Sequence, residues 1–175
     1  MSLVQWIVLL VALQRLSELW LSRRNATRLL AAGGREIGAG HYPVLVAVHV
    51  GWLLALFLLV PADAPVIWPL LGFYLILQGA RIWVIATLGR YWTTRVIHMP
   101  EEPLVRRGPY RWIRHPNYVV VVLEVATLPL AFGAWEIALA FTAANLGILA
   151  WRLRIENAAL RERENLPQPQ PQINS

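Results

Sequence analysis

Histidine, arginine, tyrosine and glutamate side chains gather in two short polar stretches of the C-terminal half of the chain, each beside an apolar segment. The first stretch contains Arg114, His115 and Tyr118, and the second contains Arg154 and Glu156. Arginine and histidine bind anions through charge-assisted hydrogen bonds, and histidine or glutamate can serve as a general base. Because a plain connecting loop needs none of this content, the two stretches are the first candidates for a binding or catalytic site.

One further ionisable residue, Glu124, lies about two helical turns into the apolar segment that follows the first stretch. Ionisable residues within a membrane usually face the protein interior and are candidates for function. Glu124 is therefore a candidate general base, as His115 is. Alternatively, Glu124 pairs with Arg81 of another apolar segment and has a structural role alone. Arg15 and Glu18 are one turn apart and are expected to pair with each other.

The composition of the elements that position these residues is that of a membrane protein. The chain has 175 residues, of which 57% are hydrophobic and only 15% are charged. Its apolar segments approach the roughly 20 residues with which a helix crosses a bilayer, and they cover residues 3–21, 44–60, 66–88, 119–131 and 135–151. Because lipid cannot satisfy backbone polar groups, the sequence predicts an all-α integral membrane protein with about five transmembrane helices. The last two segments are short, so they are expected to form a tight hairpin around residues 132–134 or to extend into flanking polar residues.

Arginine sets the predicted orientation. The formal net charge is +6, and it comes from arginine alone because the chain has no lysine. A basic chain can bind nucleic acid, but in membrane proteins arginine collects in cytoplasmic loops, and here it follows the first, third and fifth apolar segments. We therefore expect an outside N-terminus, a cytoplasmic C-terminus, contact with membrane lipids and no nucleic-acid partner.

Other features bound the organisation and the chemistry. The absence of cysteine excludes disulfides, thiolate metal sites and a cysteine nucleophile. The other histidines are not clustered, so no metal site is expected. Residues 1–165 are expected to form a single membrane-embedded domain. The tail at 166–175, in which proline repeats, is expected to be disordered.

The cytoplasmic region before the fourth apolar segment is expected to contain short strands. Residues 91–97 are rich in β-branched and aromatic side chains, which favour a strand, and residues 104–107 are expected to return as a second strand. The glycine-rich stretch 32–40 is expected to be a loop. Pro116 suits the first turn of the following helix, where a missing N–H costs little.

The sequence GPYRWIRHPNY at residues 108–118 resembles the signature of the isoprenylcysteine carboxyl methyltransferase family. That family has a second element after the last span, an arginine followed by acidic residues. RIEN at residues 154–157 is similar to this element, with Asn157 in place of a second glutamate. Residues 41–43 and 91–95 are similar to bacterial members whose acceptors are small lipidic molecules, including polyketide-derived alkylpyrones.

The resemblance implies S-adenosylmethionine as the methyl donor and a lipophilic acceptor that is methylated on a carboxyl or hydroxyl oxygen. Glu156 would bind ribose hydroxyls or the amino group of the donor, and an aromatic face such as that of Tyr118 would stabilise the sulfonium. Arg154 would orient a carboxylate acceptor, whereas a hydroxyl acceptor would need a base such as Glu124 or His115. The implied cofactor-binding residues are Tyr110, Arg114, His115, Pro116, Tyr118 and Glu156.

Two other functions stay open. The wider superfamily includes sterol-type reductases with related C-terminal elements, so an NADPH-dependent membrane reductase is the alternative enzyme, although this chain is short for that class. A non-enzymatic membrane scaffold or transport subunit would instead bind no cofactor and tolerate substitution of His115. A soluble-type methyltransferase is disfavoured, because Pro43 takes the third position of the glycine fingerprint that Gly38 and Gly40 begin.

Overall fold

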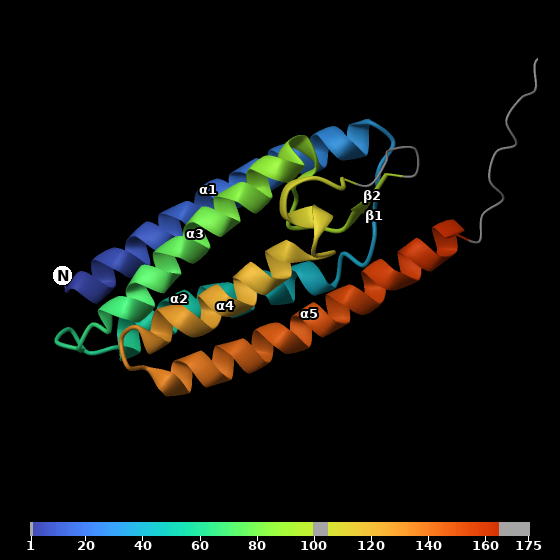
Figure 1. Cartoon of the computed structure of the whole chain (residues 1–175). Helices are drawn as coiled ribbons and strands as arrows, with labels where there is room; N and C mark the ends of the chain where they lie inside the picture. The colour runs from blue at the N-terminus through green and yellow to red at the C-terminus, as the bar shows by residue number, and fades with distance from the viewer. Residues whose placement is uncertain (1, 100–104, 165–175) are drawn as a thin grey trace, which may run out of the picture.

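The computed structural model describes residues 2–99 and 105–164, and long helices dominate it. Consecutive helices run in alternate directions, so that the chain forms an up-and-down bundle (Figure 1). The helices are α1 (Leu3–Ala31), α2 (His41–Leu59), α3 (Trp68–Leu88), α4 (Pro116–Leu130) and α5 (Trp135–Glu164).

Length and surface suit these helices to a membrane. In the described part of the chain, α1, α2, α3 and α5 are long and apolar enough to cross a bilayer, and α4, with 15 residues, is shorter. Large apolar side chains stay exposed, for example Leu58, Trp68 and Ile76 at 69%, 67% and 68% of their surface. Such a surface is unfavourable in water and suits lipid. The predicted all-α integral membrane class is therefore confirmed.

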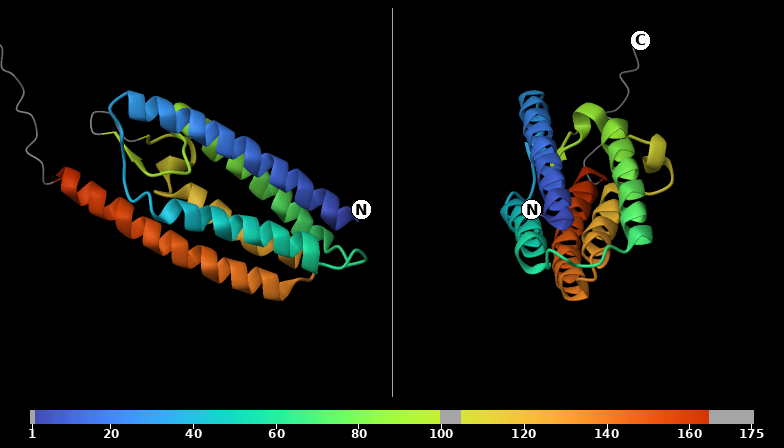
Figure 2. Two further views of the ribbon diagram at one scale, coloured as in Figure 1. Left: turned by 180° about the vertical axis from the view of Figure 1, so that it is seen from behind. Right: turned by 90° about the vertical axis from the view of Figure 1, so that its left-hand side faces the viewer.

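Two helices extend beyond their apolar segments. α1 continues past residue 21 to Ala31, and α5 continues past residue 151 to Glu164, so both project polar turns from the same end of the bundle (Figure 2). The hairpin between α4 and α5 occurs where it was predicted, with Gly133 at a φ of 71°. That positive φ favours glycine, because a side chain would be strained there.

An apolar core fills the bundle at the end that holds the N-terminus. Val4, Val8 and Val11 of α1 lie on one helix face and are buried. They belong to the same core as Leu56 of α2 and Leu128 of α4, which have no exposed surface. Burial of a side chain of this size stabilises a protein by about 1.5–3 kcal/mol, so this end of the bundle is a rigid base for the opposite end.

A two-stranded sheet lies at the opposite end (Figure 1). β1 (Arg35–Glu36) pairs antiparallel with β2 (Ile97–His98), and Arg35 stands opposite His98. The predicted strand at 91–97 is therefore wrong in extent. β1 also corrects the prediction of a plain loop at 32–40.

Side chains of α1 explain why the segment before β2 is not a longer strand. The Nδ2 of Asn25 donates to the carbonyl oxygens of Gly89, at 3.1 Å, and Trp92, at 2.8 Å. The backbone N–H of Thr94 donates to the Oγ of Ser22 at 2.9 Å. These bonds engage backbone groups that a sheet would need, so the segment begins as a 3-10 turn, η1 (Gly89–Tyr91), and then runs irregularly.

The prediction of a second strand at residues 104–107 is also wrong for the residues that the structure describes. Residues 105–107 are not in a strand, and residue 104 lies outside the described residues, as does the tail predicted to be disordered. The partner of β2 comes instead from the connection between α1 and α2.

Gly108 holds the signature stretch against α3. It begins η2 (Gly108–Arg111) with a φ of 55°, and a Cβ built there would lie 2.6 Å from the Oγ1 of Thr87. Neither the conformation nor the close approach admits a side chain. Pro116 is the first residue of α4, as predicted, so both ends of the stretch are fixed to helices.

Candidate active site

A polar cluster forms where the start of α4 meets the last turns of α5. The hydroxyl of Tyr118 donates to Oε1 of Glu156, and the Nδ1 of His115 lies 3.5 Å from Oε2 of the same carboxylate. The rings of His115 and Tyr118 are stacked, with centroids 5.1 Å apart and planes 4° apart. Three of the residues that the sequence analysis singled out are therefore brought together by two elements.

Arg152 completes the cluster. Its Nε donates to Oε1 of Glu156 at 3.1 Å, its Nη1 donates to the carbonyl oxygen of Thr94 at 2.6 Å, and its guanidinium lies 5.3 Å from the ring centroid of Tyr118. From the sequence, this arginine contributed only to the predicted orientation of the chain. Its spacing of four residues from Glu156, which places both side chains on one helix face, is the signal that would have found it.

The environment of the cluster favours uncharged forms of two side chains near Glu156. Burial lowers the pKa of His115 below its ordinary value of 6.5, and the positive charges of Arg114 and Arg152 act in the same direction against the opposing carboxylate. Burial, with a smaller contribution from Glu156, raises the pKa of Tyr110 to about 12. At neutral pH both His115 and Tyr110 are therefore neutral.

Several predicted residues lie outside the cluster. Arg154 is exposed and forms no ion pair with the described residues, because a step of two residues turns a helix by about 200° and points it away from Glu156. Arg114 is also exposed, and Pro116 is buried at the helix start.

Glu124 joins a buried network of charges instead. Its Oε2 accepts from Arg81 at 2.8 Å and from Arg15 at 2.9 Å, and its Oε1 accepts from Gln78 at 2.8 Å. The carboxylate of Glu18 accepts hydrogen bonds from the Nε and Nη2 of Arg81, at 2.6 Å and 2.5 Å, and from the Nη1 of Arg15 at 3.0 Å. The expected pair of Arg15 with Glu18 is confirmed, and the alternative in which Glu124 pairs with Arg81 also occurs. Together they form one neutral network that ties α1 to α3 and α4. Because Glu124 is 1% exposed and both its oxygens are engaged, the geometry favours its structural alternative.

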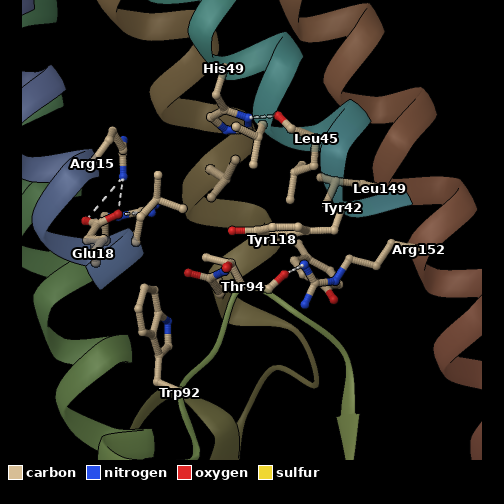
Figure 3. A pocket seen from close by; sticks show the side chains of 15 residues that line it. Arg15, Glu18, Tyr42, Leu45, His49, Trp92, Thr94, Tyr118, Leu149 and Arg152 are labelled. Atoms are coloured by element: carbon tan, nitrogen blue, oxygen red, sulfur yellow. Dashed lines mark hydrogen bonds and ion pairs between the residues drawn. The ribbon is translucent and has the colours of Figure 1, made fainter. Parts of the chain in front are cut away.

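A cavity connects this network with the polar cluster. Its volume is about 100 Å³. Figure 3 shows His49 towards one end, Trp92 towards the other and the ring of Tyr118 between them. Arg15, Glu18 and Arg81 line it from the network, whereas Glu124 does not. The apolar part of the wall is formed by Leu19, Leu45, Val46, Val121 and Leu149.

Three buried polar atoms on residues that line the cavity have no partner among the described residues. They are the Oδ1 of Asn117, the Nε1 of Trp92 and the Nε of Arg15. An unpaired buried polar group costs about 1–3 kcal/mol, so a ligand that meets these atoms recovers part of that cost. No group of three or more potential metal-ligating side chains occurs within residues 2–99 and 105–164.

Comparisons with known proteins identify a family and two relatives. The model of the isoprenylcysteine carboxyl methyltransferase (ICMT) family matches residues 70–162, which contain the polar cluster. The uncharacterized protein YpbQ of Bacillus subtilis is 34% identical over 162 residues, which cover 90% of this chain and 96% of that protein. An uncharacterized protein of Haemophilus influenzae is 27% identical over 153 residues, which cover 83% of this chain and 88% of that protein. No solved structure matches the chain significantly.

Proposed function

The chain belongs to the isoprenylcysteine carboxyl methyltransferase family of membrane methyltransferases, and on that premise we propose that it transfers a methyl group from S-adenosylmethionine to an oxygen of a lipophilic acceptor. The observation that carries the proposal is the cluster of His115, Tyr118, Arg152 and Glu156 beside a cavity that reaches into the bundle. A polar end suits a charged donor, and an apolar wall suits a lipid-like acceptor.

The residues present fit the donor. When bound, S-adenosylmethionine supplies an electrophilic methyl group on a sulfonium. The Oε2 of Glu156 keeps acceptor capacity for an ammonium or hydroxyl group, and the stacked rings of His115 and Tyr118 offer aromatic faces to a cation. The unpartnered Oδ1 of Asn117 and Nε1 of Trp92 provide a further acceptor and donor.

The apolar wall supports the choice of acceptor. Exclusion of water from the cavity strengthens every polar interaction in it. Methyl transfer requires the acceptor oxygen to lie in line with the S–CH₃ bond at near-attack distance, and the apolar wall would hold the acceptor in that position. An ionised carboxylate would need no base, whereas a hydroxyl acceptor would have to give up a proton.

We propose that the polar cluster faces the cytoplasm. The arginine-rich last turns of α1 and α5 and the arginine-rich segment after α3 lie at the same end of the bundle as the cluster (Figure 2), and arginine-rich segments stay on the cytoplasmic side. Because the chain has no cysteine, single cysteines introduced as Asp63→Cys and Arg107→Cys test this directly. An impermeant maleimide should label the first in intact cells and the second only after permeabilisation; the reverse pattern would overturn the orientation.

Calorimetry of S-adenosylmethionine on the detergent-purified full chain tests the proposed function. We expect His115→Ala and Glu156→Ala each to weaken binding by tenfold or more, about 1.4 kcal/mol. His98→Ala, in β2 and outside the cluster, is the control and should bind like the wild type. Absence of binding by the folded wild type would refute the proposal, and binding of NADPH in the same cell would then support a reductase.

A further inference from the structure

His49 of α2 presents one ring nitrogen without a partner. Its Nδ1 lies 2.9 Å from the carbonyl oxygen of Leu45, one turn earlier. A carbonyl oxygen can only accept, so Nδ1 carries the proton, and in the neutral ring Nε2 carries the lone pair. Nε2 makes no hydrogen bond to any residue in the described part of the chain, and His49 lines the cavity.

The positive charges that line the cavity are already neutralised. Arg15 and Arg81 are paired with Glu18 and with a second glutamate of the network, and Arg152 is paired with a glutamate and a carbonyl oxygen. These are the charged groups that face the cavity from α1, α3 and α5, and α4 contributes the neutral phenol of Tyr118. The cavity therefore holds no spare cation for a carboxylate acceptor, but it holds an unengaged imidazole nitrogen.

One donor in the same cavity wall complements this nitrogen. The Nε of Arg15 is buried and has no partner among the described residues, although the other guanidinium nitrogens are ion-paired. A guanidinium N–H can stabilise an oxygen that becomes negative in a medium of low dielectric constant. The wall thus combines a proton acceptor with a donor for the resulting oxyanion.

We propose that Nε2 of His49 accepts the proton of a hydroxyl acceptor and that the Nε–H of Arg15 holds the oxygen as it becomes negative. This assignment rests on the proposed methyl transfer and adds to it a general base and a substrate class, a weakly acidic hydroxyl on a lipophilic body. The O–H bond of the acceptor breaks and its proton passes to His49. The oxygen's electron pair forms the new bond to the methyl carbon, while the S–CH₃ bond breaks and its pair stays on sulfur. The sulfonium loses its charge, His49 gains one, and the proton is later released to water.

The first test reads ionisation without any methyl donor. The probe is 4-nonyl-2-nitrophenol, whose phenolate absorbs visible light, bound to the purified full chain in detergent about one pH unit below its own pKa in the same micelles. We expect the wild type and the control His98→Gln to increase the phenolate fraction. His49→Gln and His49→Asn should not, although Asn can keep the hydrogen bond to Leu45. No increase with the wild type, or the same increase with folded His49 variants, would overturn the assignment.

The second test measures transfer of a labelled methyl group to two phenols and to a fatty acid. With 4-nonylphenol, His49→Gln should lose about 100-fold or more in rate, within the usual range for a general base. With the nitrophenol, which is largely ionised at about pH 8, the loss should be smaller than about fivefold, because no proton has to be removed. Equal losses on both phenols, or a wild type that methylates the fatty acid and neither phenol, would overturn the assignment.

Calorimetry of S-adenosylmethionine on the same preparations separates the two proposals. Binding that is equal in the wild type and in His49→Gln, with the phenol results above, supports both. A wild type that binds the donor but whose His49 variants ionise and methylate both phenols normally removes only the role of His49. A wild type that does not bind the donor removes the proposed function.

Discussion

Neutralising Glu124 measures how strongly the buried charge network holds the bundle together. Glu124→Gln keeps the shape of the side chain but leaves the positive charges of Arg15 and Arg81 against the single carboxylate of Glu18. The position is 1% exposed, so water cannot compensate the excess charge. Removal of one partner from a buried ion pair costs about 3–5 kcal/mol. We expect about 3 kcal/mol, because the substituted amide can still accept one of the hydrogen bonds.

A second substitution separates charge balance from lost contacts. Arg81→Gln in the Glu124→Gln background restores one arginine against one glutamate, so the double variant should be more stable than the sum of the two single losses predicts, by about 0.5–3 kcal/mol. The partly exposed pair of Glu36 and Arg95, at 2.9 Å with side chains 20% and 34% exposed, gives the matched control. Glu36→Gln should cost less than about 1 kcal/mol.

Unfolding of each variant by added sodium dodecyl sulfate in mixed micelles, followed by tryptophan fluorescence, gives the free energies. A loss for Glu124→Gln no larger than that for Glu36→Gln would refute the structural role of the network. Loss of methyl transfer with unchanged stability would show instead that Glu124 is the general base, the alternative that the sequence left open.

Three further predictions concern the site and its support. Arg152→Gln should weaken S-adenosylmethionine binding by about tenfold, and Arg154→Gln by less than about twofold, in calorimetry; the opposite order would show that the donor is bound by Arg154, which the sequence assigned to the acceptor, and not by Arg152. Gly108→Ala should destabilise the protein by about 3 kcal/mol in thermal unfolding and Gly133→Ala by only about 1 kcal/mol, because both have positive φ but only the first meets another side chain; equal losses would show that the close approach is relieved. The lowered pKa of His115 means that the unfolded state binds more protons than the folded state just below pH 6.5, so stability is complete above about pH 6.5 and falls as the pH falls below it. His115→Gln should flatten this slope in pH-dependent unfolding, and a wild type that becomes more stable on acidification would contradict the reasoning.

Features that depend on local sequence could be predicted. Apolar runs fix helices in a membrane because the backbone has no other partner there, and the hairpin at residues 132–134 and the helix start at Pro116 follow from short-range chemistry. The pairing of Arg15 with Glu18 follows from helical spacing alone. The positions of His115, Tyr118 and Glu156 in one cluster depended on resemblance to a family, since no spacing rule connects α4 with α5.

Features that depend on contacts between distant elements could not be predicted from the sequence. β2 is a strand because α1 engages the backbone before it through Asn25 and Ser22, leaving a short stretch to pair with β1. Arg154 matched a motif, but the rotation of α5 turns Arg152 inward instead. Helical phase is fixed by packing against neighbours, so a motif read along the chain can lie two residues away from the side chain that contacts the cluster.

The placement of charge links stability with chemistry in this bundle. Arg15 and Glu18 belong to the network that fastens α1 to α3, and they also line the cavity, whereas Glu124 belongs to the network without lining it. A neutral network beside the cavity makes the wall polar without giving it a net charge. On the proposed assignment, such a wall would disfavour an anionic acceptor and would leave proton transfer to the unpaired imidazole of His49. It follows that substitutions of Arg15 or Glu18 change folding and acceptor binding together. A substitution of Glu124 should change folding alone, because Glu124 belongs to the network and does not line the cavity. A substitution of His49 should change acceptor binding alone, because His49 lines the cavity and does not belong to the network.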